Sequence, residues 1–554
     1  MQNYLIEYIY LILIILALVM ISNKLKLAYP LILVLGGLVL GFTTSFSKIT
    51  IDPEMIFFLF LPPLLYEAAW QISWKEFVRW KRVIISFAFP IVILTSCVVA
   101  LVSNTIIPGF TLALGFLLGG IVSPPDAVSA TTIMRQVNVP KTLVSITEGE
   151  SLLNDASSLI VFRFALAAII TGQFNFQQAA TSFVLVIVMG ALIGLAMGLM
   201  FYSIHRWLPT TPSIDIILTL VTPYCMYFPA EHFHFSGVLA VVCGGLFLSN
   251  RRHRILTYES RMRGVNVWIN MIFIFNGLIF MLIGLQLPSI ISQLGEISLI
   301  RAIGYGLAIS LTLVVTRLIC TLGASLFTHV MSNFIKVADP NPGWRSPIVL
   351  GWAGMRGVVS LAAALSLPMV VNGEAFPYRS LILFITFIVI MVTLVFQGLT
   401  LPWVIRKVKP EDKFSSLSVK QQDINIQKAI AQASIHFLED KHMDAKQSND
   451  HVKVLYKKLN ADLNFFDQEF DESEIKEDQP FSAYQQIYLD LLQNQRKVLN
   501  QLNQNEDYDE ELIRKYHALI DLEEFKIKET LIHHLMPDDS DQTDPLAPER
   551  RIGF

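Results

Sequence analysis

Charged residues are scarce in this chain. Asp, Glu, Lys and Arg make up 16% of its 554 residues, whereas hydrophobic residues make up 53%. Because soluble globular domains carry about 25% charged residues, this composition argues against an ordinary soluble enzyme. The mean hydropathy of +0.53 indicates instead a protein with much of its length inside a membrane.

Motifs of cofactor-dependent proteins are also missing. The four cysteines lie inside apolar stretches, without the spacing of a disulfide framework or a metal site: Cys97, Cys225, Cys243 and Cys320. The acidic and histidine residues between Glu231 and His234 lack the HExxH spacing of a zinc site. The chain has no phosphate-binding Walker loop, so nucleotide hydrolysis is not expected to drive it. No cofactor is therefore predicted.

The net charge of −3 conceals two different parts. Residues 1–410 hold 25 of the 42 basic and 15 of the 45 acidic residues, which leaves them with +10 and residues 411–554 with −13. We therefore predict a transmembrane domain over 1–410 and a cytoplasmic acidic helical tail over 411–554. The tail has helix-like spacing around 424–437, 452–466, 484–502 and 512–535. It is either regulatory, with an unknown ligand, or a plain solvated helix bundle, and its charge repels nucleic acid.

Thirteen stretches approach the roughly 20 apolar residues that a membrane-spanning helix needs. They are 4–22, 28–46, 54–72, 82–104, 110–135, 142–171, 181–206, 213–230, 235–249, 264–291, 298–331, 346–371 and 378–406. The connections between them carry nineteen basic residues on one side of the bilayer and three on the other. Since basic loops stay in the cytoplasm, we predict a multi-pass protein of the cell membrane, plasma or bacterial inner, with the N-terminus outside and the C-terminus inside.

Ionisable side chains are costly inside a membrane, so each one in a span indicates function. In the sixth span, Ser151, Asn154 and Asp155 share one face of the predicted helix. A hydroxyl, an amide and a carboxylate supply the hard oxygen ligands that a small alkali cation prefers. The alternative is a polar contact between two helices.

The fifth span contains Pro124, Pro125 and Asp126 in a row. Two prolines remove two backbone donors and break the helix, and irregular backbone at membrane depth is tolerated only where it is buried in protein or lines a cavity. The twelfth span has a comparable interruption over 351–357. Interrupted spans in corresponding positions indicate an inverted repeat, here spans 1–6 against spans 8–13. A packing kink is the alternative for the twelfth span.

Two further carboxylates lie in spans. Glu150 is five residues before Asp155, on another face of the helix, and we expect Arg356 to be its partner. Glu67 follows a proline pair in the third span and is expected to line the cation site or the route to it.

The segment Gly149–Asp155 resembles the signature of the monovalent cation/proton antiporters, which include NhaP-type bacterial proteins and animal sodium/proton exchangers. Segments 61–67, 124–128 and 352–360 are similar to further motifs of this family, in the same order, and the similarity covers about residues 1–405. The resemblance implies thirteen helices divided into a dimerisation half and a six-helix core. It also implies a homodimer that exchanges Na⁺ or Li⁺ for H⁺ across the lipid bilayer.

The resemblance assigns roles to single residues. Asp155 would be the essential cation and proton carboxylate, with Asn154, Ser151 and Asp126 beside the Na⁺ and Glu67 assisting. Glu150 and Arg356 would form a structural ion pair. The sequence Asn154–Asp155 is similar to that of the electroneutral branch of the family.

Competition between cation and proton for Asp155 is the predicted mechanism. Burial destabilises an empty carboxylate anion, so Asp155 must bind one or the other, and only the neutralised forms cross the membrane cheaply. A K⁺/H⁺ antiporter would use the same residues. The remaining alternatives are an ion channel, which passes current without coupled proton flux, and a membrane receptor or scaffold that signals through its tail.

Overall fold

The computed structural model of the chain describes residues 2–25, 28–42, 58–137, 139–172, 176–294, 297–335, 337–371, 373–411, 419–442, 449–471, 479–502 and 510–534. It divides into two compact units, Met1–Asp412 and Lys413–Phe554. The described residues are almost entirely helical. Their β-structure is one short antiparallel pair, β1 (Val370–Val371) with β2 (Glu374–Ala375).

The first unit is built of helices that follow the predicted spans closely. In chain order they are α1 (Gln2–Leu25), α2 (Tyr29–Phe42), α4 (Leu61–Gln71), α5 (Trp74–Ser86), α6 (Val92–Ile106), α7 (Leu112–Val122), α8 (Ala127–Gln136), α9 (Lys141–Thr171), α10 (Phe176–Trp207), α11 (Pro212–His232), α12 (Gly237–Ser249), α13 (Arg252–Ile255), α14 (Tyr258–Leu285), α15 (Leu287–Ser292), α16 (Leu299–Met331), α17 (Arg345–Trp352), α18 (Val358–Leu365), α19 (Arg379–Val392) and α20 (Gly398–Val408). Two π-helical turns, η2 (Phe87–Ile91) and η3 (Thr393–Gln397), join α5 to α6 and α19 to α20.

Eight continuous helical segments in the described part of the chain are long and apolar enough to cross a membrane. They are Trp74–Ile106, Leu112–Gln136, Lys141–Thr171, Ala180–Trp207, Pro212–His232, Tyr258–Ser292, Leu299–Met331 and Arg379–Val408. Three shorter apolar helices, Ile9–Leu25, Tyr29–Phe42 and Gly237–Ser249, add to them. The predicted class, an all-α protein with many membrane-spanning helices, is confirmed.

Prolines shape two of these helices in different ways. Pro90 lies within η2, where the wider turn lets the helix continue from α5 into α6 despite the missing backbone donor. The adjacent Pro124 and Pro125 instead separate α7 from α8. Two successive residues without N–H groups remove two helical hydrogen bonds, and a single π-helical turn does not compensate for both.

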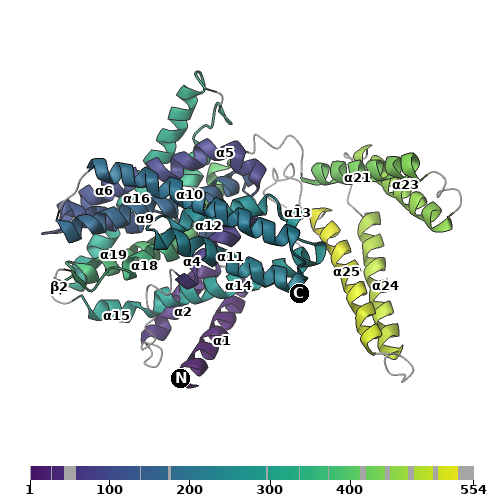
Figure 1. Ribbon diagram of the computed structural model, residues 1–554, viewed down its shortest axis with the longest axis horizontal. Coiled ribbons are helices and arrows are strands. Elements are labelled where there is room, and N and C mark those ends of the chain that lie inside the picture. The colour runs from purple at the N-terminus through teal and green to yellow at the C-terminus, as the bar shows by residue number, and fades with distance from the viewer. Residues whose placement is uncertain are drawn as a thin grey trace. The chain divides into compact units, whose positions relative to one another are not determined.

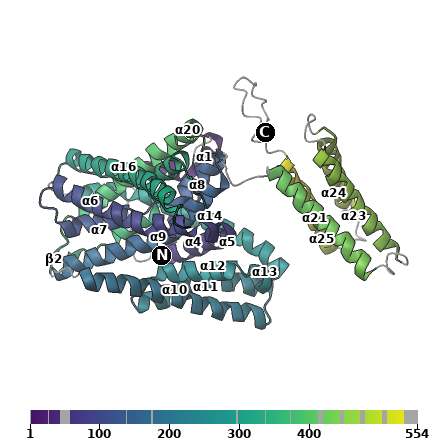
Figure 2. The same cartoon turned by 90° about the horizontal axis from the view of Figure 1, so that it is seen from above.

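The helices of the first unit pack mainly within two groups. One group contains α5 to α9 with α16, α17, α19 and α20, and the other contains α1, α2, α4, α10, α11, α12 and α14. In the second group α10, α11 and α12 lie side by side (Figure 2). Small residues allow this closeness: a Cβ on Gly194 would lie 2.0 Å from the carbonyl oxygen of Ala240. Helix α9 contacts α4 and α12, and α18 contacts α14, so these helices join the two groups.

The described residues of the second unit form four helices, α21 (Val419–Lys441), α23 (Asp450–Asp471), α24 (Gln479–Leu502) and α25 (Glu510–His534). Helix α21 packs against α23, and α24 packs against α25 (Figure 1). The side chain of Arg496 on α24 bridges Asp521 and Glu524 on α25, at 2.5 Å from each. The four stretches with helix-like spacing in the tail overlap these four helices.

Candidate cation-binding site

A cavity of about 370 Å³ lies between α2, α4, α8, α9, α14 and α18. Its polar lining consists of Tyr29, Glu67, Gln71, Asp126, Thr131, Thr132, Arg135, Glu148, Ser151, Asp155, Asn276 and Ser360. At one end the Arg135 guanidinium, 61% exposed, donates to Glu148 at 2.7 Å. Toward the middle of α9 the cavity reaches Asp155, which is 8% exposed. The cavity therefore leads from the predicted cytoplasmic end of α9 to a buried carboxylate.

The two predicted helix interruptions meet beside this cavity. Helix α7 ends at Val122 and α8 begins at Ala127, while α17 ends at Trp352 and α18 begins at Val358. The backbone N–H of Asp126 donates to the carbonyl oxygen of Met355 at 2.6 Å, which ties one interruption to the other. Four helix ends thus converge next to Asp126, and their unpaired backbone groups make this region polar.

Side chains of α9 hold the interrupted segment in place. The Asn154 amide donates to the carbonyl oxygen of Pro125 at 2.9 Å, and the Ser151 hydroxyl accepts from the backbone N–H of Ala127 at 3.2 Å. Asn154 is not among the residues that line the cavity, so its contact with the site passes through Pro125. The prediction that Asn154 is a cation ligand stays a prediction: its Nδ2 holds the backbone of the break, while its buried Oδ1 has no hydrogen-bond partner in the described part of the chain.

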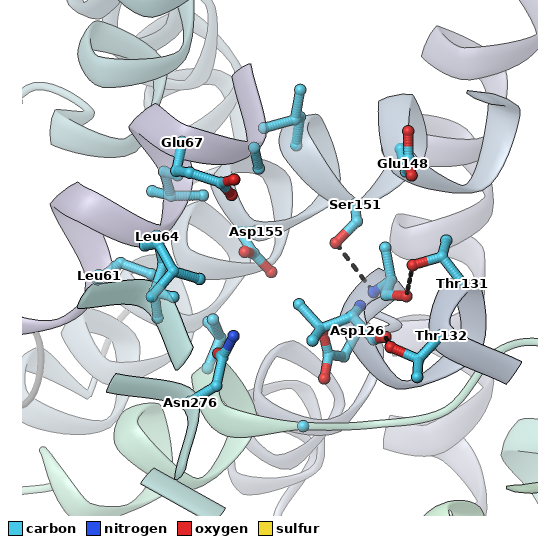
Figure 3. A pocket seen from close by; sticks show the side chains of 18 of the residues that line it. Leu61, Leu64, Glu67, Asp126, Thr131, Thr132, Glu148, Ser151, Asp155 and Asn276 are labelled. Carbon is cyan, nitrogen blue, oxygen red and sulfur yellow. Dashed lines mark hydrogen bonds between the residues drawn. The ribbon is translucent and has the colours of Figure 1, made fainter. Parts of the chain in front are cut away.

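One buried carboxylate oxygen of the site accepts no hydrogen bond from the described residues. Asp126 caps α8 by accepting from the Val128 N–H at 3.0 Å with Oδ1, but its buried Oδ2 has no hydrogen-bond partner in the described part of the chain. The Asp155 carboxylate is 8% exposed and lines the same cavity. Figure 3 shows Asp155, Asp126, Ser151 and Glu67 around the same space. Buried oxygens without donors are the arrangement that a proton or a cation would satisfy.

The predicted pair of Glu150 with Arg356 is wrong. Glu150 accepts two hydrogen bonds from Arg317 on α16, at 2.8 and 2.9 Å, and the two side chains are 1% and 3% exposed. Arg356 instead donates to backbone carbonyl groups at the helix interruptions, those of Val122 at 3.0 Å, Ser123 at 3.5 Å and Gly354. The C-terminal ends of α7 and α17 carry partial negative charge and unpaired carbonyls, which take up the Arg356 guanidinium.

Comparison with known proteins identifies the family. A family model described as "sodium/hydrogen exchanger, transmembrane" matches residues 10–407. The chain belongs to this family. The predicted resemblance to cation/proton antiporters is therefore confirmed, and the family consists of membrane transporters rather than enzymes.

Two individual relatives show how much of the chain the similarity covers. A sodium, potassium, lithium and rubidium/H⁺ antiporter of Bacillus subtilis is 32% identical over 409 residues, which cover 71% of this chain and 60% of the relative. An uncharacterized Na⁺/H⁺ exchanger of Mycobacterium bovis is 29% identical over 517 residues, 92% of this chain and 93% of the relative. That alignment is longer than the transmembrane region, so it includes part of the tail.

A solved structure supports the fold. The sodium proton antiporter MjNhaP1 from Methanocaldococcus jannaschii superimposes with a TM-score of 0.59 at 16% sequence identity. The match covers 74% of this chain and 100% of the antiporter.

On the other side of Asp155 the exchanger is closed. Arg163, eight residues further along α9, donates to the carboxylate of Glu231 at the end of α11 and to the carbonyl oxygen of Phe235 at 3.5 Å. Glu231 also accepts from the Gly237 N–H at 3.1 Å. An apolar cluster joins α9 to α4, α11 and α12 and includes Ala156, Tyr227, Val238 and Leu239. The cavity is thus accessible from one end of α9 and sealed toward the other.

Sequence reasoning on this exchanger missed Asn276, Tyr29, Thr131 and Thr132, which line the cavity beside the predicted residues. Asn276 gave only a weak signal, because the apolar span 264–291 contains three other amides, Asn266, Asn270 and Gln286. The two threonines give no such signal, since their hydroxyls donate to backbone carbonyls one turn earlier, as threonines in ordinary helices do.

Gly357 is predicted to be indispensable in this exchanger. A Cβ at this position would lie 2.2 Å from Oδ2 of Asp126, so Gly357→Ala must displace either the carboxylate or the break. We expect a loss of stability of about 1–3 kcal/mol and reduced cation-dependent proton flux. Thermal unfolding of the purified protein measures the first, and proteoliposomes the second. The matched control is Gly304→Ala on α16, where a Cβ would meet nothing within 4 Å. Equal melting temperatures for the two variants would contradict this prediction.

Proposed function

We propose that this protein is a secondary antiporter that exchanges Na⁺ or Li⁺ for H⁺ across the cell membrane, without net charge movement. The observation that carries the proposal is the buried Asp155 carboxylate, which lines a cavity beside the two helix interruptions together with the unpartnered Oδ2 of Asp126. Membership of the sodium/hydrogen exchanger family supports the same chemistry.

Asp155 binds either a proton or the cation. An ionised carboxylate at this depth has lost most of its water, so the empty form is high in free energy. Protonation or cation binding removes this cost, and both occupied forms cross the membrane more cheaply than the empty one. The protein therefore carries a cation in one direction only when it carries a proton in the other. One cation replaces one proton, so no charge moves in a complete cycle.

Three side chains supply the cation with oxygen ligands. Asp155 and Ser151 project from neighbouring turns of α9, and Asp126 projects from the break that precedes α8. Asn154 fixes the Pro125 carbonyl and thereby the position of Asp126, and Glu67 on α4 lies on the route from the cavity mouth. No resident metal is required, because the alkali cation is the substrate.

We further propose thirteen membrane crossings, with the N-terminus outside. Spans 1–6 and spans 8–13 form two inverted repeats, and span 7 joins them. The helix packing supports this. In the proposed repeats α2 corresponds to α12, α4 to α14, α6 to α16 and α7 to α17. The contact of α2 with α14 is then repeated as the contact of α12 with α4, and the contact of α6 with α7 as the contact of α16 with α17. One group of helices, which carries the site, would move against the other, which would form a homodimer in the bilayer. The acidic tail would lie in the cytoplasm.

The Arg163–Glu231 pair is predicted to keep the outer side closed. Breaking it with Arg163→Gln favours the outward-open form by up to about fivefold, because half-exposed ion pairs contribute about 0–1 kcal/mol. A cysteine at Leu159, in a background without the four native cysteines, reports the change through faster labelling by an impermeant maleimide. The matched control is Arg301→Gln, an exposed arginine on the predicted outer side. Unchanged labelling in Arg163→Gln would show that the pair does not hold the gate.

The decisive experiment uses the purified full chain in proteoliposomes with an imposed pH gradient. Addition of Na⁺ or Li⁺ is expected to dissipate the gradient equally with and without a clamped membrane potential. The Bacillus subtilis relative is named for sodium, potassium, lithium and rubidium, so K⁺ and Rb⁺ are tested in parallel. Dissipation by K⁺ alone would make the protein a K⁺/H⁺ antiporter. Current without coupled proton flux would make it a channel, and no response to any cation would overturn the proposed function.

A further inference from the structure

Four polar side chains of the cavity come from the other helix group, namely Tyr29 on α2, Glu67 and Gln71 on α4, and Asn276 on α14. Asn276 lies on α14, is 5% exposed and lines the cavity that contains Asp155 and Asp126. Figure 3 shows its side chain directed toward the space between these carboxylates. The other α14 residues that line the cavity are apolar, namely Ile269, Ile272, Phe273 and Phe280. A single amide is therefore presented to the site by an otherwise apolar helix face.

Packing does not account for this amide. Its polar neighbour is the Tyr29 hydroxyl on α2, and an asparagine side chain has four hydrogen-bonding positions to satisfy. Burying an amide is costly unless its hydrogen bonds are made, and a leucine of similar size would fill the same space on an apolar helix without that cost. The amide oxygen is, moreover, a hard neutral ligand of the kind that alkali cations accept.

Asn276, like Glu67 on α4, belongs to the helix group that does not carry the site. Asp155, Ser151 and Asp126 belong to the group that carries the site, and they would move together with the cation. Helix α14 packs most extensively on α2, in the other group, where the backbones are so close that a Cβ on Gly284 would lie 2.2 Å from the carbonyl oxygen of Val34. When one group moves against the other, Asn276 remains with α2 and α14.

We propose that Asn276 is a positioning residue for the cation in one transport state only, the state in which the cavity is open on the side of Arg135 and Glu148. Its amide contacts the cation as it arrives at Asp155 from that side, and loses the contact when the site moves. This inference rests on the proposed antiport function. Because the amide is neutral and does not titrate, it strengthens cation binding without competing for the proton.

The test compares Asn276→Leu with Asn270→Leu, a matched change at an exposed asparagine of the same helix. The apparent KM for Na⁺ is measured separately from each side, in membrane vesicles of defined orientation. Loss of one contact is expected to raise KM on the cavity side about three- to tenfold. KM on the other side, kcat and the pH profile at saturating Na⁺ stay at the values of the Asn270→Leu control.

A second variant distinguishes the loss of the cation contact from misfolding of the protein. Asn276→Asp keeps a ligand oxygen in nearly the same place, so at alkaline pH its KM on the cavity side is expected to equal or fall below the wild-type value. Equal KM values for Asn276→Leu and Asn270→Leu, or an equal rise on both sides of the membrane, would overturn the inference while the antiport function stands. Wild-type vesicles without exchange would overturn the proposed function and this inference with it.

Discussion

Replacing Asp155 by asparagine is expected to abolish cation/proton exchange and to leave the protein folded. The variant keeps the shape of the side chain but removes both its charge and its ability to exchange a proton. Asp155 lines the cavity, and asparagine occupies nearly the same volume, so the change leaves the surrounding packing in place. Removing a buried charge without a partner also removes its desolvation cost, so the melting temperature stays the same or rises.

The measurement is dissipation of an imposed proton gradient in proteoliposomes on addition of Na⁺. For Asp155→Asn it should fall to the level of empty liposomes. The control is Glu374→Gln, which neutralises an exposed carboxylate in β2 of the same unit and should exchange at the wild-type rate. If purified Asp155→Asn protein still responds to Na⁺, the carboxylate that binds the cation lies elsewhere, and Asp126 is then the first residue to test.

The parts of the structure that the sequence predicted depend on local signals. Apolar runs mark the membrane helices, and Pro124 with Pro125 marks the break, because both effects act within a few residues of their cause. The shared face of Ser151 and Asp155 follows directly from helix geometry, and both residues line the cavity.

The parts that it did not predict depend on contacts between distant segments. Three arginines lie deep within the predicted spans, Arg163, Arg317 and Arg356, and spacing along the chain cannot show which of them faces Glu150. Arg163 and Glu231, 68 residues apart, meet only because α9 packs against α12. Asn154 is on the expected helix, but which carbonyl its amide reaches depends on the path of the backbone after Pro125. In each case the missing information is the packing of one helix against another.

Replacing Arg317 by methionine is expected to be the most destabilising single change in the transmembrane unit. Glu150 and Arg317 form a bidentate pair at 2.8 and 2.9 Å with almost no exposure to solvent. Removing one partner leaves the other as an uncompensated buried charge, which costs about 3–5 kcal/mol. Unfolding of the detergent-solubilised protein by denaturant measures this loss. The reciprocal variant Glu150→Leu should be affected similarly.

The double variant Glu150→Leu/Arg317→Met should recover most of the stability, because two apolar side chains of similar volume replace a pair whose attraction is largely offset by its desolvation. A double-mutant cycle then gives a large coupling between Glu150 and Arg317. The same cycle for Glu150 and Arg356 gives a smaller one, since Arg356 is held by the carbonyl groups of Val122 and Gly354. The opposite order of couplings would mean that Arg356 neutralises Glu150 and that Arg317 is dispensable for stability. Because neither variant removes a ligand of the proposed cation site, the cycle separates the support of the fold from the chemistry at Asp155.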